Sequence, residues 1–368
     1  MLVTNQKKEM SVPCSSVGAD EGRTHYYDEK SIAESGIEGN DKIALSLDIT
    51  SLDEVLDTYF EPKEPIIENF LYPGTAILAG ASKIGKSFLV AEIAFCIATG
   101  KNFWNEKYKT TKGEVLYLAL EDDLQRIQTR FSKMFGTEGS PSLHFATASK
   151  TIEEGLMMQL TEYITKYPKT KLIIIDTLQK IRGLSNENVS YSRDYDAITQ
   201  LKNMSDKYGI CILIVHHTRK QDADDCFEKI SGTNGLMGSA DAAIIMTRKR
   251  GTTEAKLQIT GRDQQEQIIN MVQDQGTLLW NYVDSETTLW TEPADEDIER
   301  IRAFMSDKEF WSGTASELIT DACLADVAAN ALTRKLNSKA GILWNEHGIR
   351  YWTRRTNQSR LIVLDKKR

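Results

Sequence analysis

Residues 74–88 read GTAILAGASKIGKSF, an apolar run followed by a glycine-rich turn and the start of a helical pattern. The turn from Gly80 to Ser87 matches the spacing GxxxxGK followed by Ser or Thr, and it lies between a strand and a helix as a phosphate-binding loop requires. Backbone N–H groups in such a turn, with the positive end of the following helix, hold phosphate oxygens. The stretch therefore predicts a P-loop within an α/β fold.

The motif assigns chemistry to the two residues that close it. Lys86 is expected to reach the β- and γ-phosphates of ATP, and the Ser87 hydroxyl is expected to ligate Mg²⁺. The predicted nucleotide-binding residues are those that surround the phosphates: Gly80, Ala81, Ser82, Lys83, Ile84, Gly85, Lys86, Ser87 and Phe88.

Strand-like and helical patterns alternate after the motif. The apolar runs are residues 74–80, 114–120, 171–176 and 211–217, with helical patterns at 87–98, 123–135, 153–167 and 193–208. Short runs that are apolar throughout are typical of strands buried on both faces of a parallel sheet. Beyond Gly238, two strands flank a Gly-Thr-Thr turn. The pattern predicts a mostly parallel central sheet with antiparallel edge strands.

Polar residues end three of these strands, at the edge where ligands bind in such sheets. Asp176 follows KLIII, and its carboxylate is expected to hold Mg²⁺ directly or through water. Glu121 and Asp122 end the second run, and we favour Glu121 as the base that takes a proton from the attacking water. Solvated acids that cap the next helix are the alternative, since Asp122 and Asp123 could serve as N-caps.

Two histidines, His216 and His217, end the run CILIVHH. A polar side chain at this strand tip can hydrogen-bond the γ-phosphate or the attacking water. We expect His216 to have this catalytic, nucleotide-sensing function, although a histidine pair could also be structural.

Composition restricts the class of protein. The chain has 368 residues, of which 40% are hydrophobic and 27% charged, and a net charge of −8. No apolar stretch approaches the roughly 18 residues that span a membrane. The five cysteines form no CxxC pair, which disfavours a zinc site or a disulfide framework and predicts a cytoplasmic protein. Residues 1–60 are mainly acidic and residues 331–368 mainly basic, so the average charge does not exclude DNA binding.

Four segments are expected from these shifts in composition. Residues 1–45 are predicted to be a disordered acidic tail, 46–283 the ATPase domain, 284–297 a linker and 298–368 a winged-helix DNA-binding domain. The last segment is read as three helices followed by a two-stranded ribbon. Its candidate contacts with duplex DNA are Arg334 and Lys335 on a helix and Arg354 and Arg355 on the ribbon. A packing or oligomerisation module with a solvated basic face is the alternative.

With these motifs together, residues 46–282 resemble the RecA-like hexameric ATPases. The resemblance rests on GASKIGKS, LALED, LIIID and VHH and is strongest to the RepA-type replicative helicases of plasmids and mobile elements, with an ATPase domain of the AAA_25 type. It implies a homo-hexameric ring with ATP between neighbouring subunits and an arginine supplied in trans to the γ-phosphate. Arg248, Arg250 and Arg262 are the candidates, with Arg262 preferred. Where the family's arginine is expected, a few residues beyond Asp241, this sequence has isoleucine or methionine.

The same resemblance implies basic loops that face single-stranded DNA in a central pore. Lys180 and Arg182 lie on one candidate loop, and Arg219 and Lys220 lie on the other. Flexible surface loops are the alternative. The sequence thus predicts an ATP-hydrolysing DNA motor, a hexameric DNA helicase. The alternatives are an ATP-switched DNA-binding initiator or regulator, and an ATPase of recombination or mobilisation.

Overall fold

The structure is a computed structural model that describes residues 47, 49–182, 190–218, 238–356 and 359–366. The described residues form a nine-stranded sheet in the order β3-β2-β4-β5-β1-β6-β7-β8-β9 and a separate three-stranded sheet in the order β10-β12-β11. The acidic tail expected at residues 1–45 lies outside the described residues. No described helix is both long enough and apolar enough to span a bilayer.

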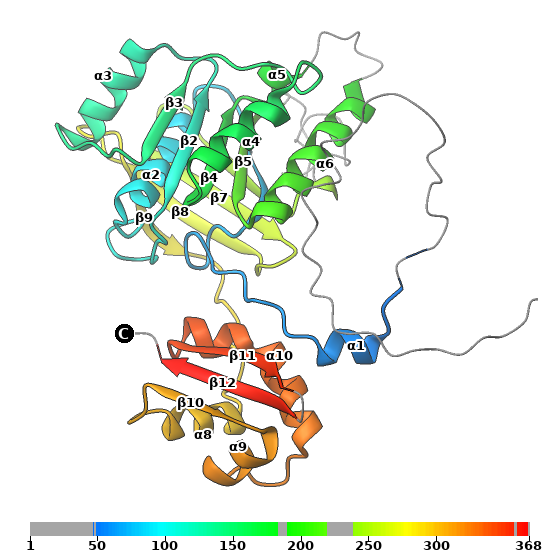
Figure 1. The fold of residues 1–368 in the computed structure, drawn as a ribbon. Helices are drawn as coiled ribbons and strands as arrows, with labels where there is room; N and C mark the ends of the chain where they lie inside the picture. The colour runs from blue at the N-terminus through cyan, green and yellow to red at the C-terminus, as the bar shows by residue number, and fades with distance from the viewer. Residues whose placement is uncertain (1–46, 48, 183–189, 219–237, 357–358, 367–368) are drawn as a thin grey trace, which may run out of the picture. The chain divides into compact units, whose positions relative to one another are not determined.

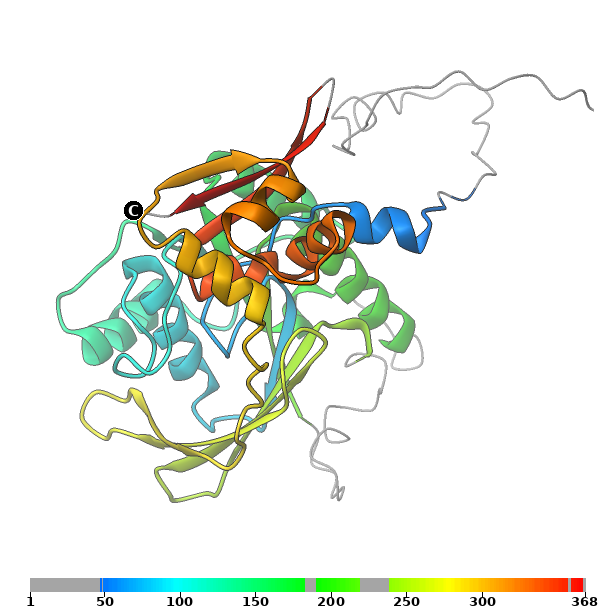
Figure 2. The same cartoon turned by 90° about the horizontal axis from the view of Figure 1, so that it is seen from below.

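Six strands of the large sheet run parallel and three extend it with antiparallel pairing. The parallel strands are β1 (Gly74–Gly80), β2 (Glu114–Ala119), β3 (Leu143–Ala146), β4 (Thr170–Asp176), β5 (Cys211–His217) and β6 (Ala242–Arg248). The antiparallel strands are β7 (Glu254–Gly261), β8 (Gln267–Gln273) and β9 (Trp280–Ser285). Figures 1 and 2 show these yellow-green strands continuing the sheet, which confirms the mixed α/β fold with a mostly parallel sheet.

Helices cover both faces of the parallel strands because side chains alternate along each strand. On one face, α2 (Lys86–Thr99) packs against Leu172 and Ile174 of β4. On the other face, Ile173 and Ile175 pack with α4 (Leu156–Lys166), α5 (Leu178–Ile181) and α6 (Ser190–Tyr208) (Figure 1). Because both faces are covered, the strands are apolar throughout rather than alternating. The amphipathic helix α3 (Leu124–Phe135) follows β2.

The C-terminal elements have an apolar core of their own. They are α8 (Glu296–Phe304), β10 (Phe310–Gly313), α9 (Ala315–Asp321), α10 (Ala329–Asn345), β11 (Ile349–Arg355) and β12 (Arg360–Lys366). Leu318, Leu332, Leu336 and Tyr351 are among the buried residues of this core. The sequence predicts the three helices and the ribbon of β11 and β12, whereas β10 is an additional strand.

A short helix, α1 (Leu52–Asp57), contacts α10. Ser51 caps it through a capping box with Glu54, but none of its helical residues is buried. Polar contacts hold it to α10, including ion pairs of Arg334 with Asp53 at 2.9 Å and with Asp57 at 2.7 Å. The helix is therefore attached mainly by charge.

Candidate nucleotide-binding site

The carboxyl ends of four parallel strands bring the predicted polar residues to one place. In the strand register, Ala119 of β2 pairs with Asp176 of β4. Gly80, the last residue of β1, pairs with His217 of β5. The P-loop, the acid that ends β4 and the residues that follow β2 are therefore neighbours at this edge of the sheet.

The P-loop has the backbone that the motif predicts. Gly85 has φ +104°, and a Cβ on it would lie 2.7 Å from Cζ2 of Trp280, so a side chain there would be both strained and obstructed. A Cβ on Gly80 would lie 2.6 Å from the Met246 carbonyl oxygen. Helix α2 begins at Lys86, so its unpaired N-terminal N–H groups lie at the end of the loop. This geometry suits the binding of phosphate oxygens.

Lys86 lies inside the loop, with its ammonium group bound to backbone carbonyls. Its Nζ donates to the carbonyl oxygens of Gly80 at 2.7 Å and Ala81 at 2.9 Å, and lies 3.2 Å from Nδ1 of His217. Burial lowers the pKa of Lys86 to about 8, although Asp176 and Glu121 act in the opposite direction. Among the described residues, no carboxylate forms an ion pair with this ammonium group, which leaves its charge available to an anionic ligand.

Ser87 and Asp176 meet as the sequence predicts. The Ser87 hydroxyl donates to Oδ2 of Asp176 at 3.2 Å, and the Tyr117 hydroxyl donates to the same oxygen at 3.0 Å. Burial raises the pKa of Asp176, although these two hydrogen bonds oppose the shift. The described residues contain no cluster of three or more His, Cys, Asp or Glu side chains that could hold a metal. One carboxylate and one hydroxyl fit Mg²⁺, which commonly takes its other ligands from phosphates and water.

The structure distinguishes the two acids that follow β2. Oδ2 of Asp122 lies 2.7 Å from Nη1 of Arg130, and both side chains are largely buried. Glu121 is 45% exposed and accepts a hydrogen bond from Oγ1 of Thr177 at 3.3 Å. Since Asp122 is engaged in an ion pair, the geometry favours Glu121 as the carboxylate that could accept a proton.

The histidine beside the P-loop is His217, and not His216 as expected from the sequence. Nδ1 of His217 lies 3.3 Å from the Ser82 hydroxyl, and its Nε2 lies 3.8 Å from Oε2 of Glu121. His216 is buried and is the preceding residue on the strand, so its side chain points to the opposite face of the sheet. The alternation of β5 carried this signal, because Leu213 and Val215 pack on the face covered by α2.

The three candidate arginines occupy different places. Arg248 ends β6 and Arg250 lies in the turn before β7, both beside the chain's own P-loop. Nη1 of Arg248 donates to the carbonyl of Ile84, a P-loop residue, at 3.3 Å. Arg262 follows β7 at the opposite end of the sheet, where its Nη2 donates to the carbonyl of Gly238 at 2.9 Å. Arg248 therefore acts within its own chain, and Arg262 is too far along the strand to reach its own P-loop.

An open pocket of about 680 Å³ adjoins the P-loop. Residues 81–84 of the loop form one wall, residues 248–253 of the β6–β7 turn form a second, and residues 273–275 with Leu278 form a third. Asp176, Glu121 and His217 lie on the other side of the loop, toward β2, β4 and β5. The site thus has a polar side for reacting groups and a separate pocket.

The residues predicted to contact DNA differ in their exposure and in whether they are paired with acidic residues. Lys180 is exposed on α5, and Arg182 follows that helix half-buried. Arg219 and Lys220 lie outside the described residues. On α10, Arg334 is bound to the acids of α1.

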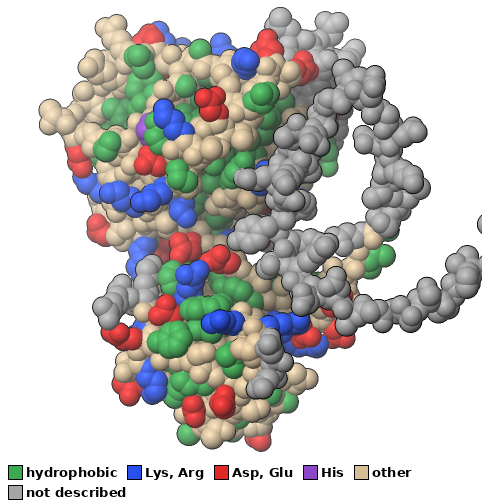
Figure 3. Space-filling view, in the orientation of Figure 1, with side chains coloured by type: hydrophobic (Ala, Val, Ile, Leu, Met, Phe, Trp, Pro, Cys, Tyr) green, Lys and Arg blue, Asp and Glu red, His purple; other side chains and the backbone are tan. Residues whose placement is uncertain are grey.

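Lys335 of α10 is bound to acids as well, with its Nζ 3.3 Å from Asp295 and in contact with Asp297. Arg354 and Arg355 are exposed at the end of β11 and form no ion pair with any described side chain. Figure 3 shows acidic and basic side chains interspersed over the C-terminal elements.

A P-loop at the end of the first strand of a mostly parallel sheet, with an acid at the end of β4, defines a P-loop nucleotide-binding fold. Residues 44–223 match the family model AAA_25, described as an AAA domain. The match covers a little under half of the chain, and it agrees with the strand order and the loop geometry in indicating a P-loop nucleotide-binding domain.

Two solved structures resemble the chain at low sequence identity. One, whose title describes an ATPase domain, is 13% identical with a TM-score of 0.46, and the match covers 58% of this chain and 85% of that one. A structure entitled "The Structure Of A DnaB-Like Replicative Helicase And Its Interactions With Primase" is 12% identical with a TM-score of 0.46, covering 58% of this chain and 59% of that one. No curated protein matches the sequence.

Proposed function

We propose that the chain is an ATP-hydrolysing motor that acts on DNA, a hexameric replicative helicase of the RepA type. The observation that supports this most directly is the convergence of Lys86, Ser87, Asp176, Glu121 and His217 at the P-loop. A buried cation that is bound to neutral acceptors, beside a hydroxyl–carboxylate pair and a more exposed carboxylate, supplies the groups that phosphoryl transfer to water needs.

In this proposal each residue has one task. When ATP binds, the ammonium group of Lys86 leaves the carbonyls of Gly80 and Ala81 and binds the β- and γ-phosphates. In this buried site it stabilises the negative charge that develops on the phosphates. Glu121 accepts a proton from the attacking water. His217 lies between Lys86 and Glu121, where it could hydrogen-bond the γ-phosphate or the attacking water. Mg²⁺, held by Ser87 and Asp176, would neutralise phosphate charge.

With the phosphates in the P-loop, the nucleoside of ATP can extend only to the side of the loop away from the reacting groups. The γ-phosphate end faces Glu121 and His217, so the base and ribose lie on the other side of the P-loop, in the pocket formed with the β6–β7 turn. That pocket's volume of about 680 Å³ is in the range of small-molecule sites. We assign it to the base of ATP.

A ring explains why an arginine lies far from its own P-loop. Arg262 is 58% exposed, with its Nη1 4.0 Å from Oδ1 of Asp241, and it lies at the end of the sheet opposite its own loop, so any γ-phosphate that it reaches belongs to a neighbouring subunit. In a closed ring of identical subunits, one face of each chain meets a different face of the next. Arg262 is therefore our candidate for the arginine supplied in trans, and the pore contacts predicted at Lys180, Arg182, Arg219 and Lys220 belong to the same proposal.

We assign residues 298–368 to a winged-helix module that contacts duplex DNA and residues 46–283 to an ATPase domain. Of the linker expected at 284–297, residues 286–295 lie between β9 and α8. The order of the elements from α8 to β12, with a ribbon after the third helix, supports this assignment. The exposed Arg354 and Arg355 at the ribbon end are the better-placed phosphate contacts, because Arg334 and Lys335 of α10 are paired with acids.

Sedimentation and strand displacement test the helicase proposal together. The full chain with ATP and a forked DNA is expected to sediment as a hexamer and to release the displaced strand, whereas Lys86→Ala releases none. A monomer that binds duplex DNA without displacing a strand would favour the ATP-switched regulator. An open filament along DNA would favour the recombination ATPase.

A further inference from the structure

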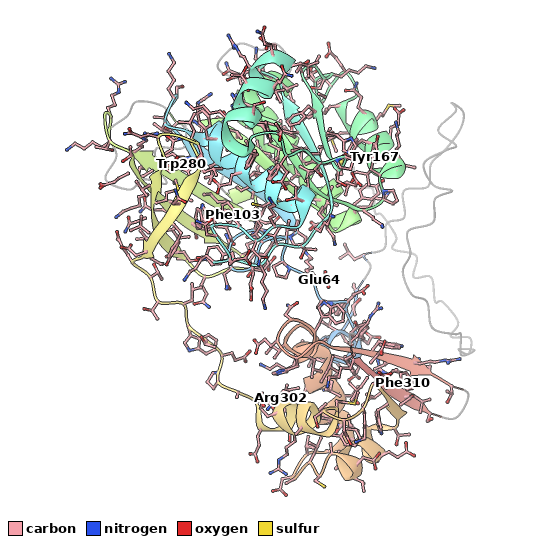
Figure 4. All side chains as sticks on the ribbon, turned by 90° about the vertical axis from the view of Figure 1, so that its left-hand side faces the viewer. Glu64, Phe103, Tyr167, Trp280, Arg302 and Phe310 are labelled. Carbon is pink, nitrogen blue, oxygen red and sulfur yellow. The ribbon has the colours of Figure 1, made fainter. Side chains whose placement is uncertain are left out.

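Two side chains from β6 and β9 lie beneath the P-loop. Arg248 at the end of β6 and Trp280 at the start of β9 both bind backbone carbonyls of the loop. Figure 4 labels Trp280 at the strand β9, next to α2. Neither contact belongs to the reacting side of the site, where Glu121 and His217 lie.

Arg248 is fixed on three sides. Its Nη1 donates to Ile84 O at 3.3 Å and to Oε1 of Gln273 at 2.7 Å, and its Nε donates to Thr252 O at 2.9 Å. Its guanidinium carbon lies 5.2 Å from the centre of the Trp280 ring, within the range of a cation–π contact. These contacts fix a planar donor group against the loop.

Trp280 is fully buried and is fixed at both ends. Its backbone N–H donates to Oε2 of the buried Glu92 at 3.0 Å, and its Nε1 donates to Gly85 O at 3.2 Å. The Gly85 carbonyl also accepts from the N–H groups of Phe88 and Leu89, both at 3.2 Å, as the first carbonyl of α2. The indole is therefore an additional donor at a carbonyl that the helix already uses.

We propose that Arg248 and Trp280 are positioning residues that hold the P-loop in the form that receives phosphate. A trans peptide is planar, so its C=O and its N–H point in opposite directions. Arg248 binds Ile84 O and thereby turns the N–H of Gly85 away from the strands, toward the space where phosphate binds. Trp280 does the same for the N–H of Lys86. The inference rests on the proposed nucleotide binding and adds residues outside the motif to it.

Conservative variants test this inference on the full chain. Arg248→Lys keeps the charge but not the fork of donors, and Trp280→Phe keeps the ring but loses the N–H donor. Trp104→Phe is the matched control, because Trp104 is a buried tryptophan whose Nε1 has no hydrogen-bond partner in the described structure. Binding of MgADP and of inorganic pyrophosphate is measured by calorimetry, and amide hydrogen exchange is measured on the nucleotide-free proteins.

The expected loss of binding affinity is larger where the loop carbonyl has fewer other hydrogen-bond donors. Arg248→Lys weakens MgADP binding about tenfold and Trp280→Phe about threefold, the scale of one hydrogen bond, and Trp104→Phe changes it less than about twofold. Pyrophosphate binding falls by the same factors, and the amides of residues 81–88 exchange faster in both site variants but not in the control.

Other outcomes overturn the proposal in distinct ways. A loss confined to MgADP means that Arg248 contacts the base or ribose instead of the loop. Unchanged binding in Arg248→Lys means that its charge alone matters. If the wild type binds neither ligand, the proposed nucleotide site fails, and unchanged loop exchange in the variants would separately reject the positioning of the loop.

Discussion

Lys86 in the P-loop and Arg334 on α10 are both cationic side chains that are at least partly buried, yet they are bound to different partners. The ammonium group of Lys86 contacts two carbonyl oxygens and an imidazole nitrogen. The guanidinium group of Arg334 contacts the carboxylates of Asp53 and Asp57, and its hydrogen bond holds the pKa of Asp57 below its usual range. The first cation keeps its charge for a ligand, whereas the second is already neutralised within the chain.

The two regions also differ in how firmly they are built. The P-loop is embedded between a buried strand and a mostly buried helix, with Trp280 packed beneath it. Helix α1 has no buried residue, and its ion pairs with α10 are partly exposed. Exposed ion pairs contribute little and weaken with salt, so α1 can be displaced from α10 far more readily than the P-loop can be rearranged.

The largest effect is expected at the P-loop lysine. Lys86→Ala should weaken MgATP binding by at least about a hundredfold, because the phosphates lose the buried ammonium group that lies within the loop. Lys83→Ala is the control, since Lys83 is an exposed lysine of the same loop that can offer its backbone N–H unchanged. Equal losses in the two variants, measured by calorimetry, would contradict the assignment of Lys86.

The next effect separates the two acids after β2. Glu121→Gln should retain MgATP binding while the steady-state rate of hydrolysis falls by a factor on the order of 10²–10⁴, the scale of a lost general base. Asp122→Asn should instead lower the melting temperature, because it leaves the largely buried Arg130 without its partner. Normal hydrolysis in Glu121→Gln would remove Glu121 as the base.

A smaller effect is expected at the ribbon of the C-terminal elements. Arg354→Ala with Arg355→Ala should reduce the slope of log K against log salt for duplex DNA by about two, since each phosphate contact contributes about 0.9. Arg302→Ala is the matched control, because Arg302 is an exposed arginine of α8 that is paired with Glu299. An unchanged slope in the double variant would exclude this ribbon from the DNA interface.

The smallest effect tests whether α1 covers a DNA contact. Asp53→Asn with Asp57→Asn should free Arg334 and steepen the same salt slope by about one. Fluorescence anisotropy with a short duplex over a range of salt concentrations measures both slopes. If the slope does not change, Arg334 is a structural residue of the contact between α1 and α10.

Strand and motif positions could be predicted from the sequence because local rules set them. The predicted strand at residues 74–80 coincides with β1, and the one at 211–217 coincides with β5, since each is apolar throughout and ends at a polar residue or a glycine turn. The short edge strands β3 and β10 were missed, because their four residues each carry no sustained pattern. Figure 1 shows where these strands lie in their sheets.

Contacts between distant segments could not be predicted in this way. The position of His217 beside the P-loop is different, because the alternation along β5 is a local signal that the preference for His216 overlooked. The pairing of Arg334 with acids some 280 positions earlier, like the donation from Trp280 to Gly85, joins residues that no local spacing connects. The P-loop was predictable because its functional residues lie within one turn. A run of basic residues, in contrast, does not indicate which acidic residues will pair with it in the fold.

The rate of ATP hydrolysis with and without single-stranded DNA shows whether this P-loop hydrolyses ATP to drive action on DNA. With Lys86→Ala as the blank, we expect hydrolysis by the wild type to rise at least about tenfold when single strands are added, as a motor coupled to its track requires. Hydrolysis that is indifferent to single strands would contradict the motor. Hydrolysis equal to that of the blank would contradict the nucleotide site itself.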